Sequence, residues 1–87
     1  MVPANPANQL TDWLVLSRPD CSLCEEMLAE LCELFGERAA RIRVQDISGD
    51  ALLESRYGRR VPVLLIDGDF VCAYRLDRAR LASYLVD

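Results

Sequence analysis

Two cysteines lie in the stretch Ser17-Arg18-Pro19-Asp20-Cys21-Ser22-Leu23-Cys24, where two sequence patterns meet. The run before it, residues 13–16 (WLVL), is continuously apolar and of strand length, as expected for a strand covered on both faces. From about Ser22 to Phe35, apolar residues recur at three- and four-residue steps, which indicates an amphipathic helix. A helix N-terminus carries unpaired N–H groups and a positive dipole end, so a thiol held there ionises more easily. The stretch therefore predicts a reactive Cys-x-x-Cys pair where a strand passes into a helix.

The middle of the chain predicts a second strand and a short second helix. Gly36 is a suitable C-cap for the first helix. Residues 41–45 (RIRVQ) alternate polar and apolar, as in a strand with one solvated face. Either Ser48 or Asp50 is expected to cap a helix that runs through about residue 56.

The last third of the chain predicts a hairpin and a final helix. Residues 61–66 (VPVLLI) form an apolar strand, and Asp67-Gly68 is a strong signal for a hairpin turn. Residues 70–74 form the returning strand. Asp77 is expected to cap the last helix, whose inner face holds Leu81, Tyr84 and Leu85. The element order is β-α-β-α-β-β-α, with the first two strands parallel and the last two antiparallel.

Length and composition exclude several classes of protein. The 87 residues leave room for one domain, expected at residues 12–87, after a mobile tail at residues 1–11. A net charge of −4 excludes nucleic acid as a main partner, because phosphate binding needs a basic face. The chain has no histidine, which excludes Cys-His and Ser-His catalysis. No signal peptide or membrane-spanning run is visible, so we expect a cytoplasmic protein with no membrane partner.

Three stretches carry a family resemblance: residues 17–26 (SRPDCSLCEE), 56–58 (RYG) and 60–64 (RVPVL). Together with the element order, they resemble the glutaredoxin-like family of small, mostly uncharacterised bacterial proteins. The resemblance extends from Trp13 to Val86. It implies an α/β, thioredoxin-like fold, in which a four-stranded mixed sheet has helices on both faces.

The resemblance also implies a substrate-binding loop. In that family the proline before the third strand is cis and faces the Cys pair, and here it is Pro62. The backbone of Val61 is then expected to pair with an extended thiol substrate by strand addition. Arg60 offers donors for a substrate carboxylate, with a solvated basic loop as the alternative. Asp77 matches the family at the start of the last helix, but residues 74–77 (YRLD) lack the glycine pair that ordinary glutaredoxins have there.

The two cysteines of the motif have different expected roles. Cys21, nearest the positive dipole end, is expected to attack a disulfide, and Cys24, one turn on, to resolve the mixed disulfide. The sequence thus predicts a small glutaredoxin-like thiol–disulfide oxidoreductase, and the alternative is a thioredoxin-fold protein-binding module with little or no redox activity. The expected substrate is glutathione or a protein disulfide. We expect a monomer without cofactor or metal, since the second Cys pair of a zinc ribbon is missing.

The remaining cysteines, Cys32 and Cys72, are expected to be unreactive core residues. A disulfide between them is left open, as is the burial of Cys72, which depends on strand register.

Nearby charges are expected to tune the pKa of Cys21. Arg18, Arg59 and Arg60 add a positive field if their loops meet beside the thiol, while two neighbouring carboxylates oppose it. We therefore expect the pKa of Cys21 to be lowered, but not to an extreme value.

Overall fold

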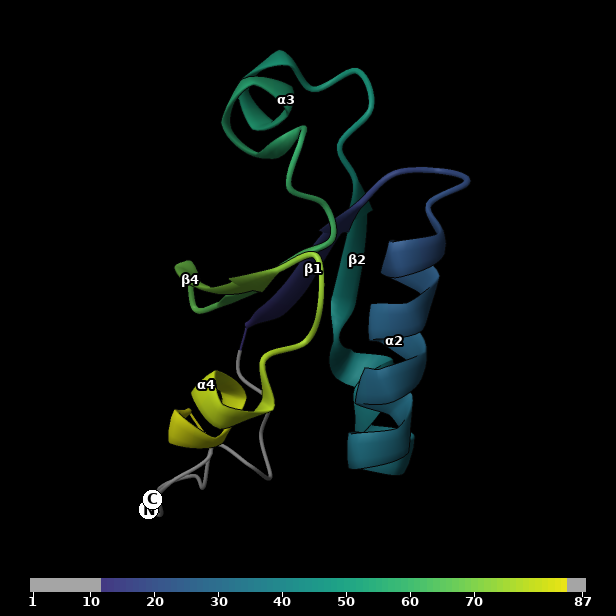
Figure 1. The fold of residues 1–87 in the computed structure, drawn as a ribbon, viewed down its shortest axis with the longest axis vertical. Coiled ribbons are helices and arrows are strands. Elements are labelled where there is room, and N and C mark those ends of the chain that lie inside the picture. The colour runs from purple at the N-terminus through teal and green to yellow at the C-terminus, as the bar shows by residue number, and fades with distance from the viewer. Residues whose placement is uncertain (1–11, 85–87) are drawn as a thin grey trace.

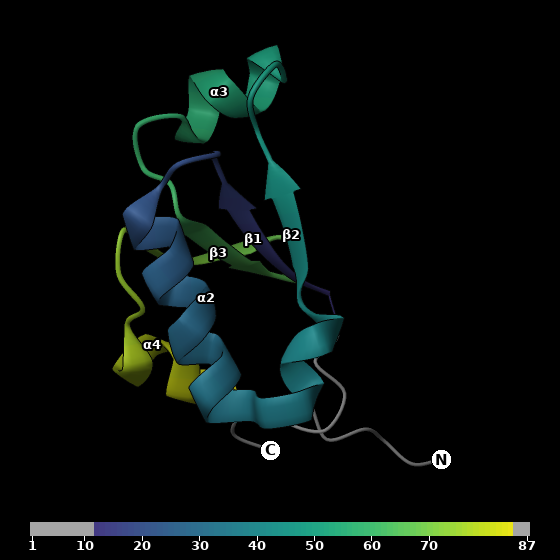
Figure 2. The same cartoon turned by 90° about the vertical axis from the view of Figure 1, so that its right-hand side faces the viewer.

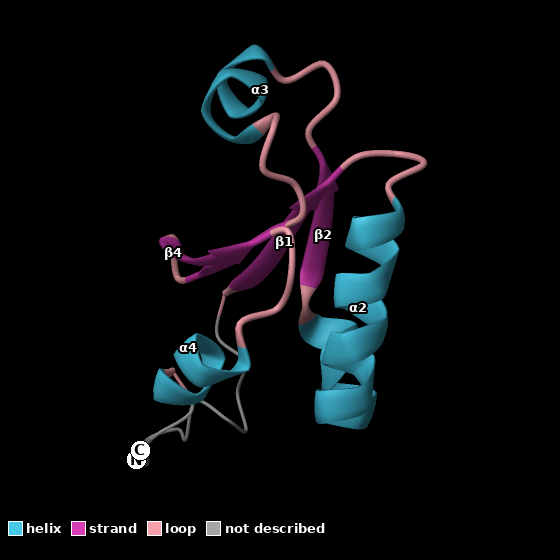
Figure 3. Cartoon of the chain, in the orientation of Figure 1, coloured by secondary structure: helices cyan, strands magenta, loops and turns pink. Residues whose placement is uncertain are grey.

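The computed structural model describes residues 12–84, which fold into one four-stranded sheet with flanking helices (Figures 1 and 3). The strands are β1 (Trp13–Ser17), β2 (Arg43–Asp46), β3 (Val63–Ile66) and β4 (Asp69–Ala73). The helices are α2 (Ser22–Phe35), the 3-10 helix η1 (Gly36–Arg41), α3 (Ala51–Tyr57) and α4 (Arg78–Ser83). The expected tail at residues 1–11 and the expected helix residue Leu85 lie outside this range. No helix within residues 12–84 is long and apolar enough to cross a membrane.

The sheet has the strand order β2-β1-β3-β4. β1 pairs in parallel with β2, and α2 makes the crossover between these two strands. β1 and β4 each pair antiparallel with β3. The predicted mixed sheet and its element order are therefore confirmed.

Two cores of unequal size lie on the two faces of the sheet, because neighbouring residues of a strand point to opposite faces. On the face of α2 and α4, Trp13 and Val15 pack with a large buried cluster: Met27, Leu31, Phe35, Ile42, Leu64, Ile66, Val71, Cys72 and Leu81. On the other face, Leu16 is buried with Ile47 and Val63, and α3 adds only the partly buried Leu53 and Tyr57. Figure 2 shows α2 and α4 together on their side of the sheet. The prediction of helices on both faces is thus confirmed.

Helix α2 buries one stripe of its surface. The buried residues fall at three- and four-residue steps: Cys24, Met27, Leu31 and Phe35. Gly36 ends the helix at φ 56°, and its N–H donates to the carbonyl of Cys32. The prediction that Cys32 is a core residue is wrong, because its side chain is exposed. One residue turns the helix by about 100°, so Cys32 points away from the stripe that contains Leu31.

Two aspartates begin the short helices, and one turn joins β3 to β4. Asp50 accepts a hydrogen bond from the N–H of Leu53 at 3.0 Å, so it, and not Ser48, caps α3. Asp77 accepts from the N–H of Arg80 at 3.0 Å and caps α4, as predicted. The hairpin turn at residues 67–68 has φ values of 51° and 87°, the positive values that a type I′ turn requires.

Strand β2 differs from its prediction in position and in burial. It starts at Arg43 and not at residue 41, because the chain after α2 forms the 3-10 helix η1 first. Val44 is 51% exposed, although the alternating pattern placed it on a covered face. β2 is an edge strand, so the pattern identified the strand without ensuring that its inner side is covered.

Candidate active site

The loop from β1 to α2 places Cys21 at the start of the helix. Asp20 has φ 57°, in the left-handed region that aspartate tolerates better than most residues, and it turns the chain after Pro19. Cys21 is the N-cap of α2, with φ −107° and ψ 105°. Its Sγ atom accepts a hydrogen bond from the N–H of Cys24 at 3.2 Å. The sulfur of Cys21 therefore lies at the positive end of the α2 dipole.

The structure brings the two predicted cysteines together. Cys21 and Cys24 form a disulfide, with their Cα atoms 5.2 Å apart. Cys24 belongs to the buried stripe of α2 and is only 3% exposed, whereas Cys21 is partly buried. The pair thus joins a partly buried cysteine to a buried cysteine one turn further on.

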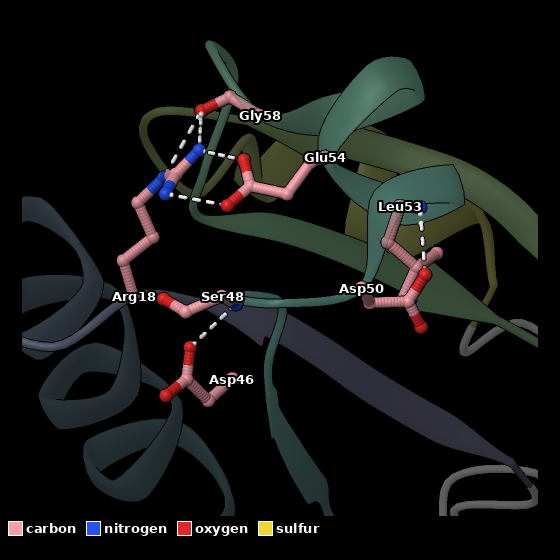
Figure 4. Close-up of polar contacts among 7 residues, drawn as sticks. All are labelled: Arg18, Asp46, Ser48, Asp50, Leu53, Glu54 and Gly58. Atoms are coloured by element: carbon pink, nitrogen blue, oxygen red, sulfur yellow. Dashed lines mark hydrogen bonds and ion pairs between the residues drawn. The ribbon is translucent and has the colours of Figure 1, made fainter.

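Arg18 forms its polar contacts with the end of α3. Its guanidinium donates to both carboxylate oxygens of Glu54, and the distance from Nη1 to Oε2 is 2.9 Å (Figure 4). The guanidinium also donates to the carbonyl of Gly58, from Nη2 at 3.2 Å and from Nε at 3.3 Å. The Glu54 carboxylate balances part of the guanidinium charge. Besides the hydrogen bonds with Ser48, Arg18 still contributes to lowering the pKa of Asp46, and the expected positive field at Cys21 stays a prediction. The contact joins the loop before α2 to the end of α3.

No local pattern in the sequence indicates this contact. Arg18 and Glu54 are 36 residues apart, so no local spacing relates them. Gly58 is needed because a Cβ there would lie 2.5 Å from the Glu54 carbonyl and 3.0 Å from Nη2 of Arg18. Its φ of −53° is ordinary, so close approach and not backbone conformation requires the glycine.

The loop after Gly58 leads into β3 and holds the predicted substrate-binding residues. The peptide bond between Val61 and Pro62 is cis, and Pro62 is buried. The carbonyl of Pro62 accepts a hydrogen bond from the N–H of Tyr74 at 2.9 Å. Within residues 12–84, neither backbone polar group of Val61 bonds to another backbone group. Figures 1 and 2 show this loop and the N-terminal end of α2 at the same end of the sheet.

The predicted polar residues of the site divide between two places. Arg60 lies in the loop before β3 and is exposed beside Arg59, and neither guanidinium forms an ion pair with a described residue. Asp77 lies at the start of α4, where its carboxylate is engaged as the helix cap. The structure therefore groups Arg60 with Val61 and Pro62, and places Asp77 on a separate element.

The two cysteines outside the motif are both free thiols, so the disulfide left open between Cys32 and Cys72 is not formed. Cys72 is 6% exposed in β4, and burial raises the pKa of its thiol, although a hydrogen bond from the backbone of Asp77 acts in the opposite direction. Across the described part of the chain, no group of three or more Cys, Asp or Glu side chains is placed to hold a metal ion.

Comparisons with known proteins agree with this architecture. Residues 13–86 match the family model described as glutaredoxin-like domain (DUF836). The solution NMR structure of protein Ne2328 from Nitrosomonas europaea is similar, with a TM-score of 0.75 and 36% identity over 86% of this chain and 91% of that chain. The X-ray structure of protein XcR50 from X. campestris has a TM-score of 0.62 and 35% identity over 84% and 93% of the two chains. The uncharacterized protein Rv0508 of Mycobacterium tuberculosis is 28% identical over 74 residues, which are 79% of this chain and 76% of that protein. The chain therefore belongs to the glutaredoxin-like domain family.

Proposed function

We propose that the chain is a thiol–disulfide oxidoreductase in which Cys21 is the attacking thiol and Cys24 the resolving thiol. The observation that carries the proposal is the asymmetric disulfide between a partly buried N-cap cysteine and a buried cysteine one turn on. In the reduced protein, the dipole end of α2 and the N–H of Cys24 favour a thiolate at Cys21. The thiolate is the form that attacks a disulfide.

The reaction transfers two electrons from the protein to a disulfide substrate. The Cys21 thiolate attacks one sulfur of the substrate, and the other substrate sulfur leaves as a thiolate. The Cys24 thiolate then attacks the sulfur of Cys21 and releases the remaining half of the substrate. The protein ends with the Cys21–Cys24 disulfide, and an external thiol reductant restores the dithiol.

The loop before β3 is proposed to hold the substrate. Since the backbone groups of Val61 bond to no other backbone group within residues 12–84, they are available to pair with an extended substrate chain, next to the buried Pro62. Arg60 is exposed and free to meet a substrate carboxylate. The Arg18 contact with Gly58 supports this arrangement, because it fixes the start of the loop to the segment that leads into Cys21.

Single-turnover reactions with an aryl disulfide test the proposal. The reduced wild type is expected to release both thiols of the substrate and to form the Cys21–Cys24 disulfide. Cys24→Ser is expected to stop at a mixed disulfide on Cys21, and Cys21→Ser to lose the fast reaction. Cys32→Ser, which removes an exposed thiol of the same helix, serves as the matched control and is expected to react as the wild type. A Cys21→Ser protein that reacts as fast as the wild type contradicts the proposal.

A protein-binding module with little redox activity is the second candidate. It is favoured by Tyr74, whose side chain is 48% exposed just before α4, in the segment where ordinary glutaredoxins carry their glycine pair. The same reactions separate the two candidates. A binding module is expected to show equally slow thiol chemistry at Cys21 and at Cys32.

A further inference from the structure

A pocket of about 230 Å³ opens between α2 and the loop from β4 to α4. It is lined by Leu23, Glu26, Met27 and Glu30 of α2 and by residues 74–76 of the loop. Leu23 stands between the two reactive cysteines in the chain. On the opposite wall of the pocket, Tyr74 donates its backbone N–H to the carbonyl of Pro62. One wall of the pocket therefore includes the residue before Cys24, and the other includes a residue that is hydrogen-bonded to the substrate-binding loop.

The size of the pocket limits what it can enclose. Pockets that enclose a drug-sized ligand measure roughly 300–1,000 Å³, so this one is suited to a single side chain or a fragment. Its apolar surface comes from the partly buried Leu23 and Leu76, because Met27 is only 1% exposed and offers almost no surface. Tyr74 is held at φ 70°, a strained value for a tyrosine, and such strain gathers at binding sites.

The charges on the pocket wall are unequally paired. Glu30 is bound by Arg78 at 2.8 Å, so its carboxylate already has a close partner. Among the described residues, the ion-pair partner of Glu26 is Arg75, at 3.5 Å, and the side chains of Arg75 and Glu26 are 76% and 62% exposed. Exposed ion pairs contribute little free energy, so an incoming cation competes with Arg75 at small cost. Glu26 is thus the carboxylate that remains available to a substrate.

We propose that this pocket takes a lysine or arginine side chain that neighbours the reacting cysteine in a protein disulfide. The inference rests on the proposed function and names its substrate class. The aliphatic stem of the side chain lies on Leu23 and Leu76, and its cation meets Glu26 at the rim. An acidic neighbour in the substrate meets the same carboxylate and is disfavoured.

Matched peptide disulfides test the inference in single turnovers. Three peptides differ only in one residue next to the cysteine, which is lysine, glutamine or glutamate. One set of three varies the residue before the cysteine, and a second set varies the residue after it. With the reduced wild type at low salt, the lysine peptide is expected to react about five-fold faster than the glutamate peptide. High salt is expected to reduce this ratio, because exposed charges are screened.

Variants of the pocket wall show where the preference arises. Glu26→Gln is expected to bring the ratio close to one, and Glu26→Lys to invert it. Arg75→Gln is expected to raise the ratio, because it removes the competing cation. Glu33→Gln is the matched control: it changes the net charge by the same amount on an exposed residue of α2 outside the pocket, and it is expected to keep the ratio.

The outcomes separate this inference from the proposed function. Equal rates for the three peptides, or a preference that survives in Glu26→Gln, overturn the pocket assignment while leaving the oxidoreductase intact. Glutathione disulfide reacting faster than every peptide also overturns it. A reduced protein that reacts with no disulfide contradicts the proposed function and, with it, this inference.

Discussion

The two faces of the sheet are stabilised in different ways. On the face of α2 and α4, eleven buried residues pack in one cluster, in which Trp13 and Phe35 meet edge to face with ring centroids 5.2 Å apart. On the face of α3, only three residues are buried, and α3 itself buries none. Polar contacts take their place there: the Asp50 cap and the bonds from Arg18 to the end of α3.

This difference separates Cys21 and Cys24, which are proposed to react, from the loop that is proposed to hold the substrate. The cysteines lie on a helix that a large apolar core holds in place. The start of the loop before β3 is held by the charged contact between Arg18, Glu54 and Gly58, with both charged side chains about one third exposed, while its end is held by the buried Pro62. Salt does not screen apolar burial, whereas it screens a partly exposed ion pair. We therefore expect the substrate loop to open more readily than the helix that carries Cys21 and Cys24.

The largest expected effect comes from the core under α2. Leu31→Ala removes a side chain that is 1% exposed, and is expected to lower the free energy of unfolding by about 2–5 kcal/mol through lost burial and a cavity. Denaturant unfolding measures the change. Leu52→Ala on α3 removes a leucine that is 74% exposed, and is the control, with an expected change within about 0.5 kcal/mol. Similar losses for the two variants contradict the contrast between the faces.

An intermediate effect is expected at the contact between Arg18 and Glu54. A double-mutant cycle with Arg18→Gln and Glu54→Gln is expected to give a coupling energy of about 1 kcal/mol, which falls as salt is added. The exposed pair of Arg43 and Asp12, whose side chains are 60% and 55% exposed, provides the control cycle and is expected to couple more weakly. In the Arg18→Gln variant, the amide groups of α3 are also expected to lose protection from hydrogen exchange before those of α2. Equal coupling in the two cycles contradicts the proposed role of Arg18.

The smallest expected effect concerns the thiol of Cys72, which is buried in the larger core. Because burial raises the pKa of Cys72 in the native state, the unfolded chain loses that proton first as pH rises. This contribution to stability is fully present below the pKa of the thiol in the unfolded chain, roughly 8.5. It is lost as the pH rises from that value through the raised native pKa. The chain contains neither lysine nor histidine, so few other groups titrate in this range.

Unfolding of the disulfide form between roughly pH 7.5 and pH 9.5 measures this effect. The free energy of unfolding is expected to fall with pH, and the fall is expected to be smaller in Cys72→Ala. Cys32→Ser is the control, since its side chain is exposed in the native state. A slope that is unchanged in Cys72→Ala shows that burial of this thiol has no bearing on stability.

Local patterns in the sequence predicted most of the fold. Each of these patterns lies within a few residues. The spacing of apolar residues indicated the bounds of α2, Asp67-Gly68 indicated the hairpin, and Asp50 and Asp77 were among the residues expected to cap helices. The Cys pair was equally visible, because a strand and a helix meet around it.

The failures were cases where contacts distant in the sequence decide the outcome. Cys32 is a separate case, because it lies one residue past the buried Leu31 and the helix turns its exposed side chain away from the stripe. The partner of Arg18 is set by the packing of α3 and not by local spacing. The charges around the pocket likewise arise from pairs such as Arg78 with Glu30, which are 48 residues apart.

The central claim is that Cys21 and Cys24 exchange reversibly between dithiol and disulfide, and a redox titration tests it most directly. The protein is equilibrated across glutathione and dithiothreitol buffers, free thiols are alkylated, and the modified cysteines are identified by mass spectrometry. The account predicts one reversible Cys21–Cys24 disulfide, with a potential between about −180 and −270 mV, while Cys32 stays alkylated throughout. A pair that remains fully alkylated in the most oxidising buffers contradicts the account.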